Sequence, residues 1–300
     1  MRVSYCDGYF VPLPERHPFP MGKFPALHRL LLDEGLIRPD DVVAPREVDW
    51  ADLLLVHTSD YLSALAQGTL SRQAERKMGL PWSERLVVRS RLAVQGTINA
   101  ALMALQDGLA ANLAGGTHHA YPGHGEGFCV LNDVAVAIRV LMRSGWVGRV
   151  LVVDLDVHQG NGTAAIFADD GRVFTFSMHG AKNYPFHKPP STRDVGLPDG
   201  LEDDAYLEIL GRELPSVLDQ ARPDLVFYLA GIDVLAGDRY GRLSLTPEGL
   251  FARDRLALEA FHRQGFPVTL LLSGGYAPTP EATAELHAIS HHAAHAVYQW

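Results

Sequence analysis

The run Val150-Leu-Val-Val-Asp-Leu-Asp-Val-His158 decides the fold of this chain. Its first four residues are apolar and bounded by charge, which is typical of a short strand covered on both faces of a sheet. Asp154, Asp156 and His158 follow at alternate positions, so extended backbone places their side chains on one face. The run therefore predicts a buried strand with polar groups gathered where it ends.

Comparable apolar runs recur along the chain and alternate with amphipathic stretches. The runs predict strands at Ala111–Ala114, Val150–Val153, Val173–Ser177, Leu225–Ala230 and Val268–Leu272. The intervening stretches predict helices at Ser83–Gln106, Asn132–Arg143, Thr163–Ala168, Asp203–Gln220 and Thr246–Gln264. Alternating strands and helices indicate an α/β fold, a three-layer α/β/α sandwich around a central, mostly parallel sheet. No shift in composition marks a boundary, so we expect a single domain over residues 1–300.

Polar residues follow every one of these strands. They are Gly115–His119, Asp154–His158, Ser177–His179, Gly231–Asp233 and Ser273–Tyr276. The carboxyl ends of parallel strands meet at one edge of the sheet, where ligands of α/β proteins bind. The sequence therefore predicts that one site is built from five strand ends.

The carboxylates and histidines at that edge favour a metal centre. Solvated carboxylates are the simpler interpretation of the run after Val153, but three ionisable groups in one crevice repel one another unless a cation compensates them. Two of these groups with Asp233 would form a three-ligand site with an open position. The tandem pair His118-His119 favours acid–base chemistry beside it, and the Tyr276 phenol could donate to an oxyanion.

Several of these segments carry a family resemblance. They are Gly115–His119, Gly127–Asp133, Asp154–Gly162, Gly231–Asp238 and Ser273–Tyr276. In order and spacing the chain resembles the arginase/deacetylase superfamily, specifically the zinc-dependent histone deacetylases and their bacterial relatives. The stretches His17–Lys23 and Asp233–Arg239 resemble the class IV branch.

The resemblance implies roles for individual residues of this sequence. Asp156, His158 and Asp233 would bind one zinc ion, while His119 would act as general base and acid with His118 as its electrostatic partner. Tyr276 would donate to the oxyanion, and Gly127 and Phe128 would line the acyl-lysine tunnel, with Tyr184 or Phe186 on its other wall. Asp154 would hold His118 and, with Ser177 and Met178, bind a structural potassium ion. Asn161 would orient His119 and, as a neutral amide, make it less basic than a carboxylate partner would.

The implied function is zinc-dependent hydrolysis of an acyl-lysine amide, the acyl group being acetyl or a longer fatty chain. Three glycines in the segment Gly123–Gly127 suggest side-chain volume left free for a long chain. Hydrolysis of acetylpolyamines or other small acylated amines is the alternative; it would favour an acidic tunnel mouth, but we expect Glu126 to be a solvated loop carboxylate. A two-metal ureohydrolase lacks its bridging carboxylates here, and a non-catalytic acyl-lysine binder would be expected to lack a ligand, the base or the tyrosine. Iron, cobalt or manganese would also suit the ligands.

Composition narrows the partners and the compartment. The 300 residues include 26 basic and 35 acidic side chains, a net charge of −9, without a basic cluster, so nucleic acid is not an expected partner. Neither a signal peptide nor an apolar run of about 18 residues is visible, and two cysteines suit a reducing compartment, so we expect a cytoplasmic protein without a membrane span. His287, His291 and His295 recur every four residues, and we expect them on a surface or oligomer face rather than in a site. A homo-oligomer is left open.

Overall fold

The computed structural model describes residues 1–299 and contains one eight-stranded sheet with the strand order β2-β1-β3-β8-β7-β4-β5-β6. The strands are β1 Val3–Ser4, β2 Val42–Val43, β3 Leu109–Asn112, β4 Val150–Asp154, β5 Val173–Gly180, β6 Arg193–Leu197, β7 Leu225–Leu229 and β8 Val268–Leu271. Every pairing in the sheet is parallel, so the expected mostly parallel sheet is confirmed.

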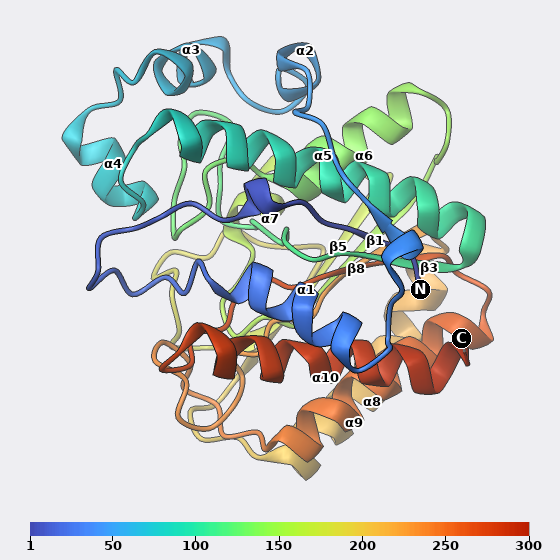
Figure 1. The fold of residues 1–300 in the computed structure, drawn as a ribbon. Coiled ribbons are helices and arrows are strands. Elements are labelled where there is room, and N and C mark those ends of the chain that lie inside the picture. Colours follow the sequence, from blue (N-terminus) through green and yellow to red (C-terminus); the bar gives the residue numbers. More distant parts are fainter. Residues whose placement is uncertain (300) are drawn as a thin grey trace.

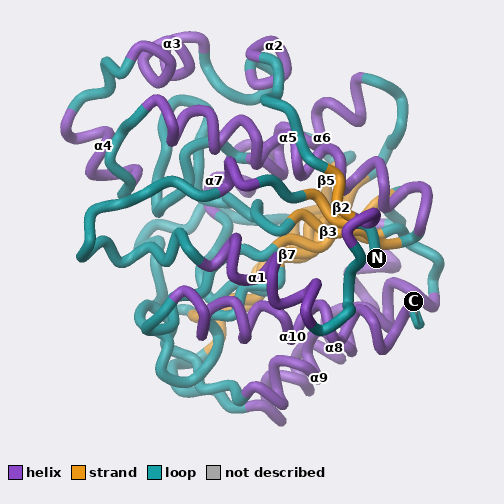
Figure 2. Tube along the Cα trace, viewed as in Figure 1, coloured by secondary structure: helices purple, strands orange, loops and turns teal. Residues whose placement is uncertain are grey.

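Helices cover both faces of this sheet (Figure 1), and the strands lie as a central layer between them (Figure 2). On one face lie α2 Trp50–Leu53, α3 Ser59–Gln67, α4 Arg72–Met78, α5 Glu84–Asp107, α6 Asp133–Arg143 and α7 Asn161–Phe167. On the other lie α1 Lys23–Asp33, α8 Asp203–Ala221, α9 Pro247–Arg263 and α10 Pro280–Tyr298. The three-layer α/β/α architecture is confirmed.

The alternation of side chains along β4 explains why the sheet has a core on each face. Leu151 and Val153 belong to the apolar cluster under α1, α8, α9 and α10, whereas Val150 and Val152 belong to the cluster under α5 and α6. Successive side chains of a strand point to opposite faces. Because β4 is apolar at successive positions, both of its faces have to be covered, which agrees with the three-layer fold expected from the sequence.

Local sequence signals set the ends of the longer helices. Ser83 accepts a hydrogen bond from the amide of Leu86 at the start of α5, and Gly108 ends that helix in the left-handed conformation. Thr246 caps α9 in the same way, with Pro247 at its first position. These caps satisfy backbone groups that a helix terminus leaves unpaired. The five predicted helices are present with ends shifted by no more than two residues.

The sequence analysis did not find every element. Strands β1, β2 and β6 and helices α1 to α4 were not predicted, and β3 begins at Leu109 rather than Ala111. Strands β1 and β2 have two residues each, and β6 has the sequence Arg-Asp-Val-Gly-Leu, so none has an apolar run of four or more residues. Among the described residues no helix combines the length and apolar character needed to cross a membrane.

Candidate active site

Loops at the carboxyl ends of β3, β4, β7 and β8 bring the predicted metal ligands together. One ligand atom each of Asp156, His158 and Asp233 lies within 4.8 Å of the other two, and all three side chains are buried. His158 Nδ1 is 3.0 Å from Asp156 Oδ1 and 3.1 Å from Asp233 Oδ2. His158 Nδ1 therefore faces two carboxylates, Asp156 from the loop after β4 and Asp233 from the loop after β7.

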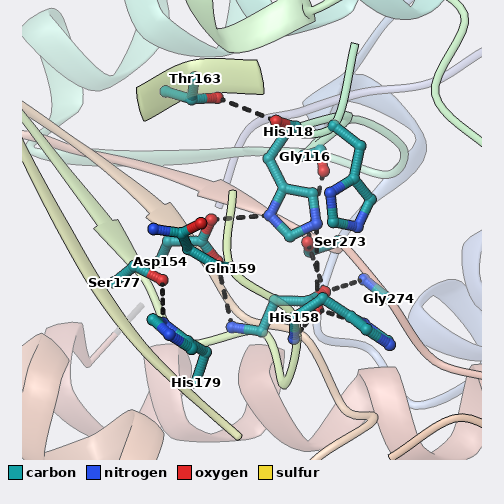
Figure 3. A network of polar contacts seen from close by, with 12 residues as sticks. Gly116, His118, Asp154, His158, Gln159, Thr163, Ser177, His179, Ser273 and Gly274 are labelled. Atoms are coloured by element: carbon teal, nitrogen blue, oxygen red, sulfur yellow. Dashed lines mark hydrogen bonds and ion pairs between the residues drawn. The ribbon is translucent and has the colours of Figure 1, made fainter. Parts of the chain in front are cut away.

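Backbone groups hold the two carboxylates in place. Asp156 Oδ2 accepts hydrogen bonds from the amide of Gly274 at 2.6 Å and the hydroxyl of Ser273 at 2.8 Å, contacts that Figure 3 shows beside His158. Asp233 Oδ1 accepts from the amide of Val157 at 2.9 Å. A Cβ atom on Gly274 would collide with both aspartates. Only glycine allows this approach, so the Ser-Gly-Gly turn after β8 is part of the centre.

The chemistry of these donors fits a divalent cation. Burial and the neighbouring Asp156 raise the pKa of Asp233 to about 7, and the two carboxylates outweigh burial and raise the pKa of His158 to about 10. Without a cation the centre therefore has to hold protons. Two carboxylates and one imidazole neutralise a charge of +2 and leave coordination positions open, which suits zinc and related transition metals.

The tandem histidines differ because their partners differ. His118 Nδ1 lies 2.7 Å from Asp154 Oδ2, and the carboxylates of Asp154 and Asp156 outweigh burial and raise the pKa of His118 to about 9. His119 Nδ1 lies 2.6 Å from the amide oxygen of Asn161. Burial, with His118 and His158 nearby, lowers the pKa of His119 well below its usual value. His118 is thus held as a cation and His119 as a neutral ring that can accept a proton.

Tyr276 is buried at the same place. Its amide donates to Asp238 Oδ2 at 2.8 Å, and its ring packs against Tyr240 and Phe128 with centroids 4.9 and 5.8 Å away. Burial, followed by the charges of Asp233 and Asp156, raises the pKa of the phenol well above its usual value. The phenol stays protonated and can serve as a hydrogen-bond donor.

The residues predicted for a monovalent cation lie behind the three candidate metal ligands. Asp154 is buried, is paired in register with Ser177 of β5, and accepts the amide of Asp156 at 3.2 Å. The Ser177 hydroxyl is 2.9 Å from His179 Nδ1 (Figure 3). Met178, the residue between these two in the sequence, is buried. Burial raises the pKa of Asp154, as expected of a carboxylate that needs a positive partner.

A cavity of about 410 Å³ leads to these groups. Its lining includes Gly127 and Phe128, as predicted, with His119, His158, Tyr184 and Tyr276, and adds Arg76, Lys77, Gly79 and Tyr240. Amides of Gly127 and Phe128 donate to the carbonyls of Lys77 and Met78, so the end of α4 positions this wall. Ser71 and Gly79 bracket α4 as its caps, a signal in the sequence that the analysis did not use. Phe186 is 96% exposed and forms no part of the lining.

Two expectations about the loop 123–127 are wrong. Glu126 is not solvated: its side chain is 8% exposed and is paired with Lys77 Nζ at 2.8 Å. A Cβ on Gly125 would meet the carbonyl of Cys129 at 2.7 Å, and one on Gly127 would meet the His119 ring. These glycines permit close packing and do not leave free volume, whereas a Cβ atom on Gly123 would meet only the Thr58 hydroxyl, at 4.0 Å.

The histidine repeat in α10 is also not a surface ladder. His287 and His291 are buried against the rest of the fold, and His287 Nε2 lies 3.2 Å from the buried Lys23 Nζ. His295 is exposed, and His292 pairs with Glu34 at 2.9 Å. Helix α10 packs between α1 and α9, so its small apolar residues face the core together with His287 and His291.

A family model of the histone deacetylase domain matches residues 17–292, and the chain belongs to the histone deacetylase family of the arginase/deacetylase superfamily, a family of hydrolases. An uncharacterised protein of Picosynechococcus sp. is 52% identical over 99% of both chains. Histone deacetylase 2 of Arabidopsis thaliana is 33% identical over 91% of this chain and 74% of its own. The crystal structure of the HDA15 HD domain has the same fold, with a TM-score of 0.79 at 23% identity over 100% of this chain and 91% of that one.

Proposed function

We propose that this protein is a zinc-dependent amidohydrolase that removes short acyl groups, acetyl above all, from lysine side chains of proteins or peptides. One observation carries the proposal: the buried centre of Asp156, His158 and Asp233 lies with neutral His119 and protonated Tyr276 at the base of a 410 Å³ cavity. A metal ion, when bound, supplies Lewis-acid polarisation of an amide carbonyl and of water.

The chain's own residues divide the proton transfers. His119 accepts a proton from the attacking water on the ring nitrogen that is free of Asn161, and it returns this proton to the leaving amine. Tyr276 donates a hydrogen bond to the developing oxyanion. His118 is already protonated beside Asp154 and accepts no further proton. Its charge disfavours the protonated form of His119 and so promotes proton transfer from His119 to the leaving amine.

The volume beyond the metal centre supports a short acyl group. A second cavity, lined by residues that include Lys23, Arg89, Gly116 and Cys129, adjoins His119 and Tyr276 and has about 40 Å³. This space is about a tenth of the 410 Å³ of the cavity that leads to the site, so it favours a short acyl group such as acetyl, and the fatty-acyl alternative would require the space to widen.

The charge at the tunnel mouth favours acyl-lysine over acetylpolyamine. Arg76 and Lys77 line the mouth, and the exposed Arg239 lies 5.7 Å from the ring of Tyr240, which lines the same cavity. Of the carboxylates beside this cavity, Glu126 is buried and already paired with Lys77, and Asp238 accepts the backbone amides of Tyr240 and Tyr276. A polyamine carries further ammonium groups that these cations repel, whereas a peptide backbone does not.

We also propose that Asp154 binds potassium. Its burial, the raised pKa of its carboxyl group and its register with Ser177 support a cation site there. His118 already offers Asp154 one positive charge, and a potassium ion in contact with the same carboxylate would stabilise its ionised form further.

A substrate panel with metal control tests the proposal. Exhaustive chelation should abolish hydrolysis and added zinc should restore it, and kcat/KM should fall from acetyl- to octanoyl- to myristoyl-lysine in one peptide. N-acetylspermidine should be the poorer substrate, and Arg76→Glu with Arg239→Glu should improve it. Arg212→Glu, an exposed reversal on α8, is the control. Full turnover by metal-free protein, or a preference for the polyamine, would contradict the proposal.

A further inference from the structure

The buried carboxylate of Glu126 connects three parts of the site. Its Oε1 accepts hydrogen bonds from the Asn161 amide nitrogen at 3.1 Å and from the phenol of Tyr184. Its Oε2 lies 2.8 Å from Lys77 Nζ and 3.1 Å from His124 Nε2. Burial alone would raise the pKa of Glu126, but these donors outweigh it and lower the pKa, so the group is ionised.

An ionised carboxylate can only accept hydrogen bonds, and this fixes the protons of its neighbours in turn. Asn161 has to present its NH₂ end to Glu126, so its carbonyl oxygen faces His119 Nδ1 at 2.6 Å. An oxygen that only accepts requires a proton on Nδ1. In the neutral ring of His119 the lone pair then lies on Nε2, the nitrogen available to the substrate.

We propose that Glu126 is a positioning residue that fixes the orientation of the Asn161 amide and, through it, the tautomer in which His119 can act as a base. The two ends of an asparagine amide have nearly the same shape, so Asn161 alone does not specify one orientation. A flipped amide would donate to Nδ1 and move the ring proton to Nε2, where it blocks proton acceptance. The inference rests on the proposed role of His119 as the base.

Glu126→Gln is the decisive substitution because it changes one oxygen into a donor and keeps the shape. The Lys77 ammonium attracts the new carbonyl, which turns the new NH₂ toward Asn161 and flips its amide. We expect kcat to fall about 10- to 100-fold with little change in KM or bound zinc. Glu213→Gln is the matched control: Glu213 is a largely buried glutamate paired with Arg193 at 2.7 Å, remote from the site, and should keep wild-type kcat.

A second substitution separates orientation from general support of the fold. Asn161→Asp offers His119 an acceptor at either end and needs no residue to orient it, although it places a second carboxylate beside Glu126. The double variant Glu126→Gln, Asn161→Asp removes this repulsion and should recover most of the kcat lost in Glu126→Gln. If Glu126 had a merely structural role, the losses of kcat in the two single variants would add up in the double variant.

The tautomer itself can be read without an activity assay. In zinc-loaded protein labelled with ¹⁵N-histidine and assigned with His119→Ala, we expect the His119 proton on Nδ1 in the wild type and on Nε2 in Glu126→Gln. A proton on Nδ1 in both proteins, or no recovery in the double variant, would overturn the inference while the wild type remains active. An inactive wild type would instead contradict the proposed function, and the tautomer measurement would still decide the role of Glu126.

Discussion

Acid should destabilise this protein through His57, a buried histidine that holds the active-site loop from behind. Its Nδ1–H donates to the carbonyl of Tyr121 at 3.1 Å, and its Nε2 accepts from the amide of Asn132 at 3.0 Å. Both ring nitrogens are satisfied only in the neutral form. A proton on Nε2 would face the backbone N–H of Asn132, so this hydrogen bond would be lost. Burial lowers the pKa of His57 to about 4.

The size of the effect follows from this pKa. An unfolded histidine titrates near pH 6.5, about 2.5 units higher, and each unit is worth 1.36 kcal/mol. The folded-state pKa is the lower one, so the stabilisation is complete above pH 6.5 and is lost as the pH falls toward 4, because the unfolded chain binds a proton that the fold excludes. Between pH 7 and pH 5 the loss is about 2 kcal/mol, out of a total stability of roughly 5–15 kcal/mol.

Urea unfolding at pH 7 and pH 5 measures this loss. His57→Gln removes the titrating ring, so the wild type should lose about 2 kcal/mol more than this variant between the two pH values. Burial also lowers the pKa of His179 and of His291 to about 4, but both remain in the variant and cancel. His295→Gln, an exposed position on α10, should keep the full wild-type loss. Equal losses in wild type and His57→Gln would refute the reasoning.

Three substitutions test the proposed roles of site residues. Tyr276→Phe should lower kcat about 10²- to 10³-fold with unchanged zinc content and melting temperature, since the ring still packs on Tyr240; near-normal kcat would exclude the phenol as donor. Asp233→Ala should lose zinc, measured by elemental analysis, and retention of one equivalent would mean that Asp233 is no ligand. Asp154→Asn should abolish a rise of the melting temperature in potassium over tetramethylammonium, and a wild type indifferent to potassium would contradict a cation site at Asp154.

The parts of the fold and site that were predictable are those specified locally. The apolar run before Asp154 and the spacing of Asp154, Asp156 and His158 place a buried strand and its polar end without any knowledge of distant contacts. Parallel strands then bring Asp233 and Tyr276 to the same edge. Burial was harder to predict: the four-residue histidine repeat suits a helix, but only the packing of α10 on α1 and α9 determines which side is covered.

Contacts between loops could not be predicted for a different reason. Glu126 and Asn161 are 35 residues apart, and α4, which places Lys77 against Glu126, is a short polar helix without an apolar periodicity. A solvated loop carboxylate was the natural expectation for such a residue. Gly125 and Glu126 are buried because Tyr61, Met78 and Cys129 pack directly against Gly125, and no local sequence pattern indicates these contacts.

The tandem histidines show that the partner, and not the residue type, decides the role. His118 and His119 are adjacent, equally buried and only 4.1 Å apart by ring centroid. Asp154 gives the first a full negative charge and keeps it protonated, while Asn161 gives the second an acceptor without a charge. Two cationic rings at this distance would repel each other, so protonation of His118 itself favours the neutral form of His119. An amide partner therefore suits a base beside a cation, provided that a third residue fixes which end of the amide faces the ring.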